Sequence, residues 1–281
     1  MVTIIKALQN NRNLPGDTPV LDAELLLCGV LNCQSSYLRA WPDRELSDEQ
    51  ESQFASLIDQ RVQGVPVAHL LGRQAFWTLE LEVSPITLIP RQDTERLVEQ
   101  SLELGLPSDA MVLDLGTGTG AIALAIATER PLWSILGTDF RAEITALAER
   151  NAQHNHIANA DFMVSDWFKA LAGQQFDLIV SNPPYIAPTD PHLGSGDLRF
   201  EAKTALVADK HGMAALELIA DEARGYLKEG GWLLMEHGYD QALLVRACLE
   251  RFKYSEVLTR QDFGGNDRVT AARYRTVQGV G

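Results

Sequence analysis

The chain has 281 residues, enough for one large domain or two modest ones. Hydrophobic residues make up 46% and charged residues 22%, which is ordinary for a globular protein and excludes wholesale disorder. The net charge of −14 disfavours a protein that grips long DNA or RNA, because such a surface repels phosphate backbones and the chain has no basic run.

The three cysteines, Cys28, Cys33 and Cys248, are few and odd in number, and they lack the paired spacing of metal ligands. This usage indicates a reducing compartment and neither a disulfide nor a zinc framework. The six histidines show no metal-ligand spacing, so we expect no bound metal. No apolar stretch is long enough for a membrane span, and residues 1–30 lack the layout of a signal peptide. We therefore expect a cytoplasmic protein that does not bind membranes.

Residues 1–74 are predicted to form a small all-α domain. Asp22 opens an acidic first turn that leads into an apolar face, and Ser47 with Gln50 has the spacing of a capping box. The following helix carries one apolar stripe at three- and four-residue spacing. No catalytic spacing occurs in this segment, so we expect a domain that recognises a partner or substrate.

Residues 75–90 are predicted to form a β-hairpin linker. Phe76, Trp77, Leu79, Leu81 and Val83 alternate with polar residues before a Ser-Pro pair. The change of hydrophobic period separates this segment from the helices before it.

Residues 91–281 show the strand–helix alternation of a doubly wound α/β domain with a largely parallel sheet. In such a fold, ligands bind outside the carboxyl ends of the strands. Apolar, partly β-branched runs predict strands at 111–113, 134–136, 162–164, 176–180 and 232–235, and a late, antiparallel strand at or near an edge at 268–274. Helices are expected between them, including 121–129, 141–151 and 212–227.

A glycine-rich loop follows the first of these strands: Asp114-Leu115-Gly116-Thr117-Gly118-Thr119-Gly120. Glycines between a strand and a helix let a ligand approach the backbone closely. Taken alone, the loop is typical of both NAD and S-adenosylmethionine proteins, because Gly116 and Gly118 also fit a loose dinucleotide fingerprint. Asp139, at the end of the second strand, can accept hydrogen bonds from both ribose hydroxyls in either class. The choice between the cofactors depends on the next motif.

The second motif, Asn182-Pro183-Pro184-Tyr185, comes shortly after the fourth strand. An amide or aromatic amine is a poor nucleophile because its lone pair is delocalised, but two acceptors that hold both N–H groups can direct that lone pair at a sulfonium methyl group. We expect the Asn182 side-chain carbonyl and the Pro183 backbone carbonyl to be these acceptors, since two prolines hold the backbone rigidly. Tyr185 offers a face for a planar group. Catalysis then depends mainly on positioning, and no strong base is needed.

With these residues the chain resembles the release factor glutamine N5-methyltransferases, bacterial enzymes that methylate the glutamine of the Gly-Gly-Gln loop of peptide-chain release factors. The resemblance spans essentially the whole chain. Besides the two motifs and Asp139, it includes residues 165–167, 88–91, 93–95, 199–201 and 265–270. Gln92 and Ala202 stand where the family usually has proline, and both lie outside the methyl-transfer residues.

The resemblance implies a seven-stranded class I methyltransferase fold that uses S-adenosyl-L-methionine and releases S-adenosyl-L-homocysteine. It implies that Gly116, Thr117, Gly118, Thr119 and Gly120 bind the methionine part of the cofactor and that Asp139 binds its ribose. Other implied cofactor contacts are Asp166 and Trp167, which would border the adenine, and Asn182. Catalysis is assigned to Asn182, Pro183 and Tyr185, and substrate binding to the same three residues with Pro184.

Several alternatives remain open at this point. One relative of the family methylates a glutamine of a ribosomal protein. A nucleic-acid adenine or guanine amino methyltransferase shares the Asn-Pro-Pro-Tyr motif, but the net charge of −14 disfavours direct nucleic-acid binding. An NAD-dependent oxidoreductase leaves Asn182–Tyr185 unexplained. A binding protein without activity is disfavoured by the intact motifs.

Overall fold

The computed structural model describes residues 2–194 and 196–276, and the chain divides into two compact units. The first unit comprises Met1–Arg73 and Pro191–Phe200, and the second comprises Gln74–Asp190 and Glu201–Gly281. Residues 191–200 therefore belong with the N-terminal segment, although they come after the fourth strand of the large sheet.

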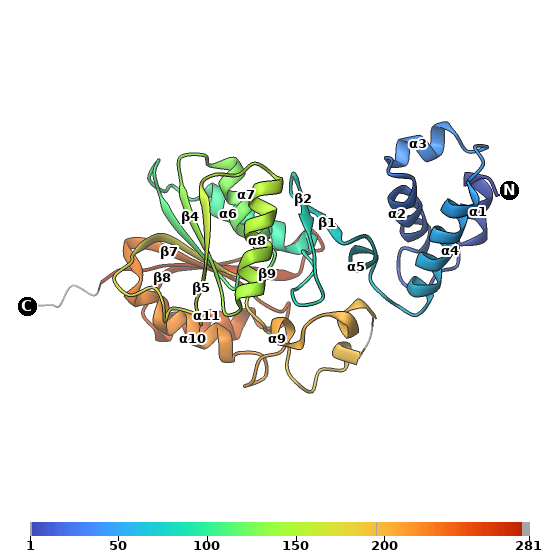
Figure 1. The fold of residues 1–281 in the computed structure, drawn as a ribbon. Coiled ribbons are helices and arrows are strands. Elements are labelled where there is room, and N and C mark those ends of the chain that lie inside the picture. The colour runs from blue at the N-terminus through green and yellow to red at the C-terminus, as the bar shows by residue number, and fades with distance from the viewer. Residues whose placement is uncertain (1, 195, 277–281) are drawn as a thin grey trace, which may run out of the picture. The chain divides into compact units, whose positions relative to one another are not determined.

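The first unit is helical, as predicted, and its helices are labelled α1–α5 in Figure 1. Ser47 and Gln50 form the predicted capping box, with the Gln50 N–H donating to Ser47 Oγ at 3.2 Å and the Ser47 N–H donating to Gln50 Oε1 at 3.0 Å. The elements are α1 (Ile4–Asn10), α2 (Pro19–Leu31), α3 (Ser35–Ala40), α4 (Asp48–Val62), α5 (Val67–Leu71) and the short 3₁₀ turns η2 (Pro191–Gly194) and η3 (Gly196–Phe200).

Arg61 forms a buried ion pair with Asp22 and a second pair with Asp197, which links residues 191–200 to this unit. Arg61 Nε lies 2.7 Å from Asp22 Oδ2, and Arg61 Nη1 lies 3.2 Å from Asp197 Oδ1. Both Arg61 and Asp22 are buried, so removal of either partner leaves an uncompensated buried charge. One arginine on α4 thus joins α2 to the segment around η3.

The hairpin is shorter than predicted and begins earlier. Its strands are β1 (Arg73–Phe76) and β2 (Leu79–Glu82), and residues 83–90 form a loop. Trp77, expected in a strand, lies in the turn with φ at +56°, where side chains cannot continue the alternation. Asn151 forms two hydrogen bonds with the end of β2 within the second unit. Glu82 N donates to Asn151 Oδ1 at 2.7 Å, and Asn151 Nδ2 donates to Glu82 O at 3.0 Å.

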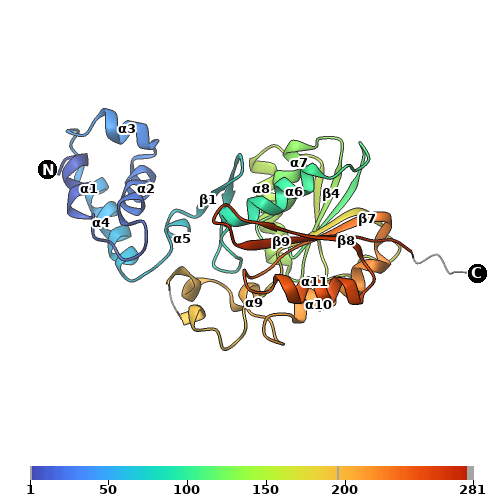
Figure 2. The same cartoon turned by 180° about the vertical axis from the view of Figure 1, so that it is seen from behind.

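The second unit contains the predicted α/β fold, built on a seven-stranded sheet in the order β5-β4-β3-β6-β7-β9-β8. The strands β3 to β7 are parallel, and β9 is antiparallel to both β7 and β8. Figure 2 shows the antiparallel pair β8 and β9 clearly. The strands are β3 (Met111–Leu115), β4 (Ser134–Asp139), β5 (Ala160–Val164), β6 (Phe176–Ser181), β7 (Leu227–Glu236), β8 (Ser255–Gln261) and β9 (Asp267–Arg273).

The remaining elements of this unit are mostly helices that cover the sheet. They are η1 (Gln92–Thr94), α6 (Glu95–Glu103), α7 (Ala121–Glu129), α8 (Ala142–His154), α9 (Lys203–Leu206), α10 (Ala214–Glu222), η4 (Ala223–Gly225) and α11 (Ala242–Arg251). The helix expected over 212–227 ends at Glu222, because β7 already begins at Leu227. Ala202, which stands in place of a family proline, has φ at −64°, a value that proline also adopts.

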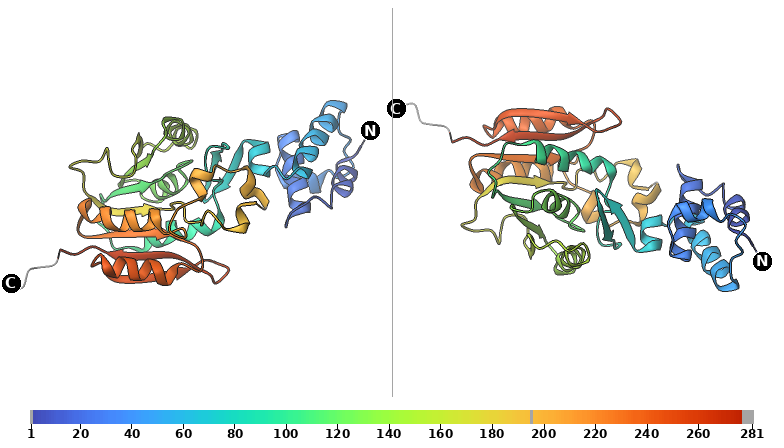
Figure 3. Two further views of the ribbon diagram at one scale, coloured as in Figure 1. Left: turned by 90° about the horizontal axis from the view of Figure 1, so that it is seen from below. Right: turned by 90° about the horizontal axis from the view of Figure 1, so that it is seen from above.

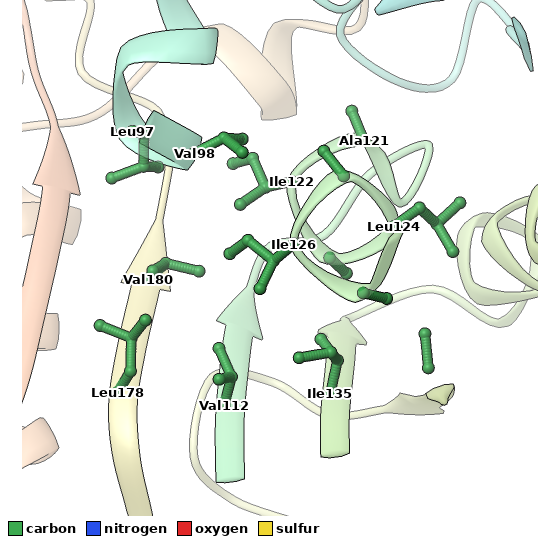
Figure 4. Close-up of a cluster of buried hydrophobic side chains, with 14 of the residues drawn as sticks. Leu97, Val98, Val112, Ala121, Ile122, Leu124, Ile126, Ile135, Leu178 and Val180 are labelled. Atoms are coloured by element: carbon green, nitrogen blue, oxygen red, sulfur yellow. The ribbon is translucent and has the colours of Figure 1, made fainter. Parts of the chain in front are cut away.

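Helices lie on both faces of the sheet (Figure 3). Two clusters of buried hydrophobic side chains pack between these helices and the strands. In the first, α6 and α7 pack on β3, β4 and β6, as Figure 4 shows for Leu97, Ile126 and Val112. The second includes Leu216 of α10 and Leu249 of α11. Helix α7 is buried along its whole length except at its last two residues, which explains its almost uniformly apolar sequence. None of the helices in the described part of the chain combines the length and apolar character that a membrane crossing requires.

Candidate active site

The site lies where the sheet reverses its order. The chain adds β4 and β5 on one side of β3 and then crosses to place β6 on the other side, so the loops after β3 and β6 are neighbours. Leu115, the last residue of β3, pairs with Thr138 on β4 and Ser181 on β6. The glycine loop, Asp139 and Asn182 therefore gather at one edge, as the sequence predicts.

A cavity of about 340 Å³ opens at this edge, within the size range of small-molecule sites. It lies wholly within the second unit. Eight of the nine predicted cofactor residues line it: Gly116, Thr117, Gly118, Thr119, Asp139, Asp166, Trp167 and Asn182. Gly120 does not.

The glycine loop is held open by backbone geometry. Gly116 and Gly118 have φ at +72° and +55°, a region that side chains disfavour, and a Cβ atom at either would meet nothing within 4 Å. The Thr117 N–H donates to Thr138 O at 2.8 Å, and the Gly118 N–H donates to Asp139 Oδ2 at 3.1 Å. The loop therefore presents its backbone to free space. Gly120 instead caps α7 and faces the packed interior.

Asp114 is fully buried beneath this loop. Its Oδ2 atom accepts from Thr117 Oγ1 at 2.7 Å and from the Ala123 N–H at 3.2 Å, whereas its buried Oδ1 atom has no hydrogen-bond partner among the described residues. Burial raises the pKa of this carboxyl group to about 7. Asp114 does not itself line the cavity, but Thr117, which donates to its Oδ2 atom, does, so the carboxyl group supports the loop from below.

Asp139 ends β4 with both carboxylate oxygens engaged by backbone. Oδ1 accepts from the Phe140 N–H at 2.8 Å, Oδ2 accepts from Gly118, and burial raises the pKa of the group. Each oxygen retains acceptor capacity for a ligand hydroxyl. Phe140, next in the chain, is half exposed and lines the cavity, which gives an apolar surface beside the carboxylate.

Asp166 and Trp167 also line the cavity, on the loop after β5. Asp166 is exposed and pairs with Lys169, while Trp167 is half-buried with φ at +51°. Such a value is strained for a bulky residue. Ser165 holds the turn, since its hydroxyl donates to Trp167 O at 2.6 Å and accepts from the Ala170 N–H at 3.1 Å.

The residues of the Asn-Pro-Pro-Tyr motif differ in their surroundings. Asn182 and Pro184 line the cavity, whereas Pro183 and Tyr185 do not. Asn182 Nδ2 donates to Thr94 Oγ1 at 3.1 Å, which leaves its carbonyl oxygen available. The Tyr185 hydroxyl donates to Glu236 Oε1 at 3.3 Å, and the Tyr185 carbonyl accepts from Gln241 Nε2 at 2.9 Å. The expected contacts of Pro183 and Tyr185 with a substrate stay predictions.

Residues 86–90 were predicted to be part of the linker, but most of them line the cavity. Glu201 anchors this loop: its Oε2 accepts from the Ile89 N–H at 2.9 Å, and its Oε1 is paired with Arg91. Glu201 is buried, and the pairing with Arg91 compensates its buried charge. The segments 88–91 and 199–201 both belong to the family resemblance, which marked Arg91 and Glu201. Nothing in their spacing along the sequence showed that these two residues contact each other. Ile144, Thr204 and Ala205 also line the cavity and were not predicted.

These features fit a nucleoside-type cofactor with a charged amino-acid tail: an open glycine backbone, a buried orphaned carboxylate oxygen, a carboxylate for hydroxyls and apolar walls. Within residues 2–194 and 196–276, no three His, Cys, Asp or Glu side chains gather as a metal ion would need. The expectation that no metal takes part stays a prediction.

Comparison with known proteins agrees with this geometry. The family described as "Methyltransferase domain" matches residues 106–274, more than half of the chain, and "PrmC N-terminal domain" matches residues 6–72. The solved structure of a methyltransferase from Pyrococcus furiosus has a TM-score of 0.54 at 20% identity, with coverage of 72% of this chain and 91% of that one. The fold and the site thus define a methyltransferase.

Relatives with curated names narrow the class. The release factor glutamine methyltransferase of Salmonella typhimurium is 52% identical over 94% of this chain and 95% of its own length. That of Escherichia coli is 50% identical over 92% of this chain and 93% of its own length. The chain belongs to the release factor glutamine methyltransferase family.

Proposed function

We propose that this protein transfers a methyl group from S-adenosyl-L-methionine to the side-chain amide nitrogen of the glutamine in the Gly-Gly-Gln motif of peptide-chain release factors. The observation that carries the proposal is the placement of Asn182: its NH₂ group is taken by Thr94, and the residue lines the same cavity as the glycine loop and Asp139. Membership of the family supports the choice of substrate.

The cofactor supplies an electrophilic methyl group when it is bound. The open backbone of Gly116 and Gly118 would hold its amino-acid part, and Asp114 Oδ1 is a free buried acceptor near that loop. Asp139 would accept from the ribose hydroxyls, and Asp166 and Trp167 would border the adenine together with Phe140, which also lines the cavity. S-adenosyl-L-homocysteine is then the second product.

The chain's own residues have to orient a poor nucleophile. The Asn182 carbonyl oxygen would accept one N–H of the substrate glutamine, and the Pro183 backbone carbonyl the other. Held in this way, the nitrogen lone pair faces the methyl donor, and the barrier falls through positioning. The methylated amide loses one proton to water. No general base is needed, which agrees with the lack of a nucleophile–base pair among the residues assigned to the site.

The alternative substrates are less well supported. The relatives at about half identity over most of the chain carry the release factor name, so a ribosomal-protein glutamine is not favoured. The net charge of −14 argues against a nucleic-acid substrate.

Substitution of Asn182 tests the proposal. Asn182→Ala should keep its affinity for S-adenosylmethionine and lose most methyl transfer to a release factor in single turnover. Asn182→Asp should also be impaired, because a carboxylate stabilises a cationic ground state more than a transition state in which that charge disperses. It also cannot donate to Thr94 when ionised. A near-normal rate for Asn182→Ala at saturating cofactor would refute the assignment.

A further inference from the structure

A side chain from a distant part of the chain holds the backbone carbonyl of Tyr185, the last residue of the Asn-Pro-Pro-Tyr motif. Gln241, directly before α11, is 6% exposed, and its Nε2 atom donates to Tyr185 O at 2.9 Å and to His211 O at 3.3 Å. Its Oε1 atom accepts from the Gly238 N–H at 2.8 Å. All four residues belong to the second unit.

The orientation of the Gln241 carboxamide follows from its partners. A backbone N–H only donates and a backbone carbonyl only accepts, so the oxygen of Gln241 must face Gly238 and its NH₂ group must face the two carbonyls. An ionised glutamate only accepts, and a methionine has no N–H group, so neither reproduces this pattern. The position therefore requires an amide.

Gly212 leaves the space that the Tyr185 carbonyl occupies. Its φ is +86°, a region that side chains disfavour, and a Cβ atom at this position would overlap Tyr185 O and lie 2.6 Å from Gln241 Nε2. The next residue after the carbonyl is also fixed, since the Ile186 N–H donates to Leu206 O at 2.9 Å. The carbonyl is therefore enclosed by a glycine and an amide, and the chain leaves it in a fixed direction.

We propose that Gln241 is a positioning residue for methyl transfer, because it holds the Tyr185 carbonyl and thereby restricts the Pro183 carbonyl two residues earlier. The inference rests on the proposed function, in which the Pro183 carbonyl is the second acceptor of the substrate amide. Gln241 does not line the cavity, so it acts through the motif and not by contact with the cofactor. Gly212 is required as the residue that lets the carbonyl reach Gln241.

The motif can transmit this restraint because it is short and stiff. The rings of Pro183 and Pro184 fix two of its φ angles, and Pro184 also restricts the conformation of the residue before it. At the other end of the motif, Asn182 Nδ2 donates to Thr94 Oγ1 at 3.1 Å. Both ends are therefore held. Release of the Tyr185 carbonyl would free the remaining torsions, so that the Pro183 carbonyl no longer keeps one direction.

The kinetic test uses the full-length protein with a release factor and saturating S-adenosylmethionine. Gln241→Met removes the hydrogen bonds at similar side-chain length, and Gln241→Glu keeps only the acceptor. We expect the single-turnover rate of both variants to fall about tenfold to a hundredfold, with unchanged affinity for S-adenosylmethionine. Gln100→Met is the matched control and should keep the wild-type rate. Gln100, on α6 of the same unit, is 7% exposed, and its Oε1 atom has no hydrogen-bond partner among the described residues.

Gly212→Ala tests the same contact from the other side. The added Cβ atom should push the Tyr185 carbonyl away from Gln241, so we expect a similar loss of rate. Alanine is also strained at this φ, and Gly173→Ala controls for the strain: Gly173 has φ at +80°, but a Cβ atom there meets nothing within 4 Å. Gly173→Ala should keep the wild-type rate. Equal losses in the two glycine variants would count against the role of Gly212.

A second measurement needs no substrate. Tyr185-Ile186 is the only Tyr-Ile pair in the sequence, so protein labelled with ¹³C at the tyrosine carbonyl and with ¹⁵N in isoleucine gives a single correlation between these atoms. Loss of a hydrogen bond moves a carbonyl ¹³C signal upfield, and we expect this shift in both Gln241 variants and in Gly212→Ala. The Ile186 N–H should stay protected from solvent exchange in the Gln241 variants, since it donates to Leu206 O.

The outcomes separate the inference from the proposed function. An unshifted Tyr185 carbonyl signal in folded Gln241→Met protein, or wild-type rates in both Gln241 variants, would overturn the inference. A rate loss that appears only as weaker cofactor binding would also overturn it. If Gln241→Met fails to fold, Gln241→Glu and Gly212→Ala carry both measurements. If the wild type leaves release factors unmethylated, the proposed function fails, and the carbonyl signal alone decides whether Gln241 holds the motif.

Discussion

At the scale of single residues, the site depends on groups that are far apart in the sequence. Asn182, the glycine loop and Asp139 could be predicted because each stands in a motif beside a recognisable strand. Thr94 could not, since it contacts Asn182 across 88 positions of the chain and nothing in its local sequence marks it as a partner. Glu236 was missed for the same reason: only tertiary packing brings the end of β7 beneath Tyr185.

Asp139 gives the first prediction. Asp139→Ala removes a charged acceptor for the ribose and also releases the Gly118 N–H, so S-adenosylmethionine affinity should fall by about tenfold to a hundredfold, or ~1.5–3 kcal/mol. Calorimetry measures this directly. Asp161→Ala, which removes an exposed carboxylate on the neighbouring strand β5, should leave the affinity unchanged. Unchanged binding in a folded Asp139→Ala protein would remove Asp139 from the cofactor site.

The pH dependence gives the second prediction. Burial, with a further contribution from Asp93, raises the pKa of Glu236 to about 7, while Thr94, Arg268 and Tyr185 act in the opposite direction. Below this pH the carboxyl group is protonated and is no longer a pure acceptor for the Tyr185 hydroxyl, which holds one end of the Asn-Pro-Pro-Tyr motif. The single-turnover rate should therefore rise as pH increases through about 7.

Glu236→Gln is the control for this pH profile, since it has no titrating carboxyl group. The rise should be absent in this variant. If it persists, the titrating group is another one, and Asp114, whose pKa is also raised to about 7, is the first candidate.

At the scale of elements, β4 is fitted tightly against the cofactor loop. A Cβ atom on Gly137 would lie 2.5 Å from the Phe162 ring and 2.8 Å from Thr117 Oγ1. Phe162 belongs to β5, so the glycine in β4 sets the distance between the neighbouring strand's side chain and the loop. The requirement for a glycine here is one of space, because its φ lies outside the left-handed region.

The third prediction follows from this fit. Gly137→Ala should destabilise the protein by ~1–3 kcal/mol, because Phe162 or the strand must shift, and should weaken cofactor binding through Thr117. Gly105→Ala is the matched control, since a Cβ atom there meets nothing within 4 Å, and it should cost almost nothing. Denaturant unfolding measures both. Equal stabilities would show that Phe162 moves aside freely.

Element prediction succeeded where the pattern was long and failed where it was short or mixed. The predicted bounds of α7 coincide with those observed, because an apolar helix between a glycine loop and a charged end is unmistakable. β8 was missed because five of its seven residues are polar or charged, as suits an exposed edge strand. The hairpin was placed too late because Trp77, an apolar residue in the turn, imitates strand alternation.

At the scale of the whole molecule, the chain forms two compact units, and the sequence showed their bounds only in part. The helical nature of residues 1–74 could be predicted from capping and periodicity. That residues 191–200 belong with them could not, because the contact of Asp197 with Arg61 joins positions 136 apart. Residues 191–200, which begin a few residues after Tyr185, thus belong to the helical unit.

The fourth prediction concerns this division. All residues that line the cavity belong to the second unit, so a protein that lacks residues 1–73 should bind S-adenosylmethionine with unchanged affinity. It should methylate a full-length release factor at least about tenfold more slowly, since each 1.4 kcal/mol of lost docking energy is a factor of ten. A short Gly-Gly-Gln peptide is the control substrate and should show no such difference. Equal turnover of the full-length substrate would assign recognition to the second unit alone.

The central claim is that the methyl group goes to one nitrogen of one glutamine. The most direct measurement is fragmentation mass spectrometry of a release factor after incubation with the protein and S-adenosylmethionine, with ribosomal proteins treated in parallel. We predict a mass increase of one methyl substitution, localised to the side-chain amide of the Gly-Gly-Gln glutamine, in the release factor only, and its loss with Asn182→Ala. Methylation of a ribosomal-protein glutamine, or of another release factor residue, with the Gly-Gly-Gln glutamine unmodified would contradict the claim.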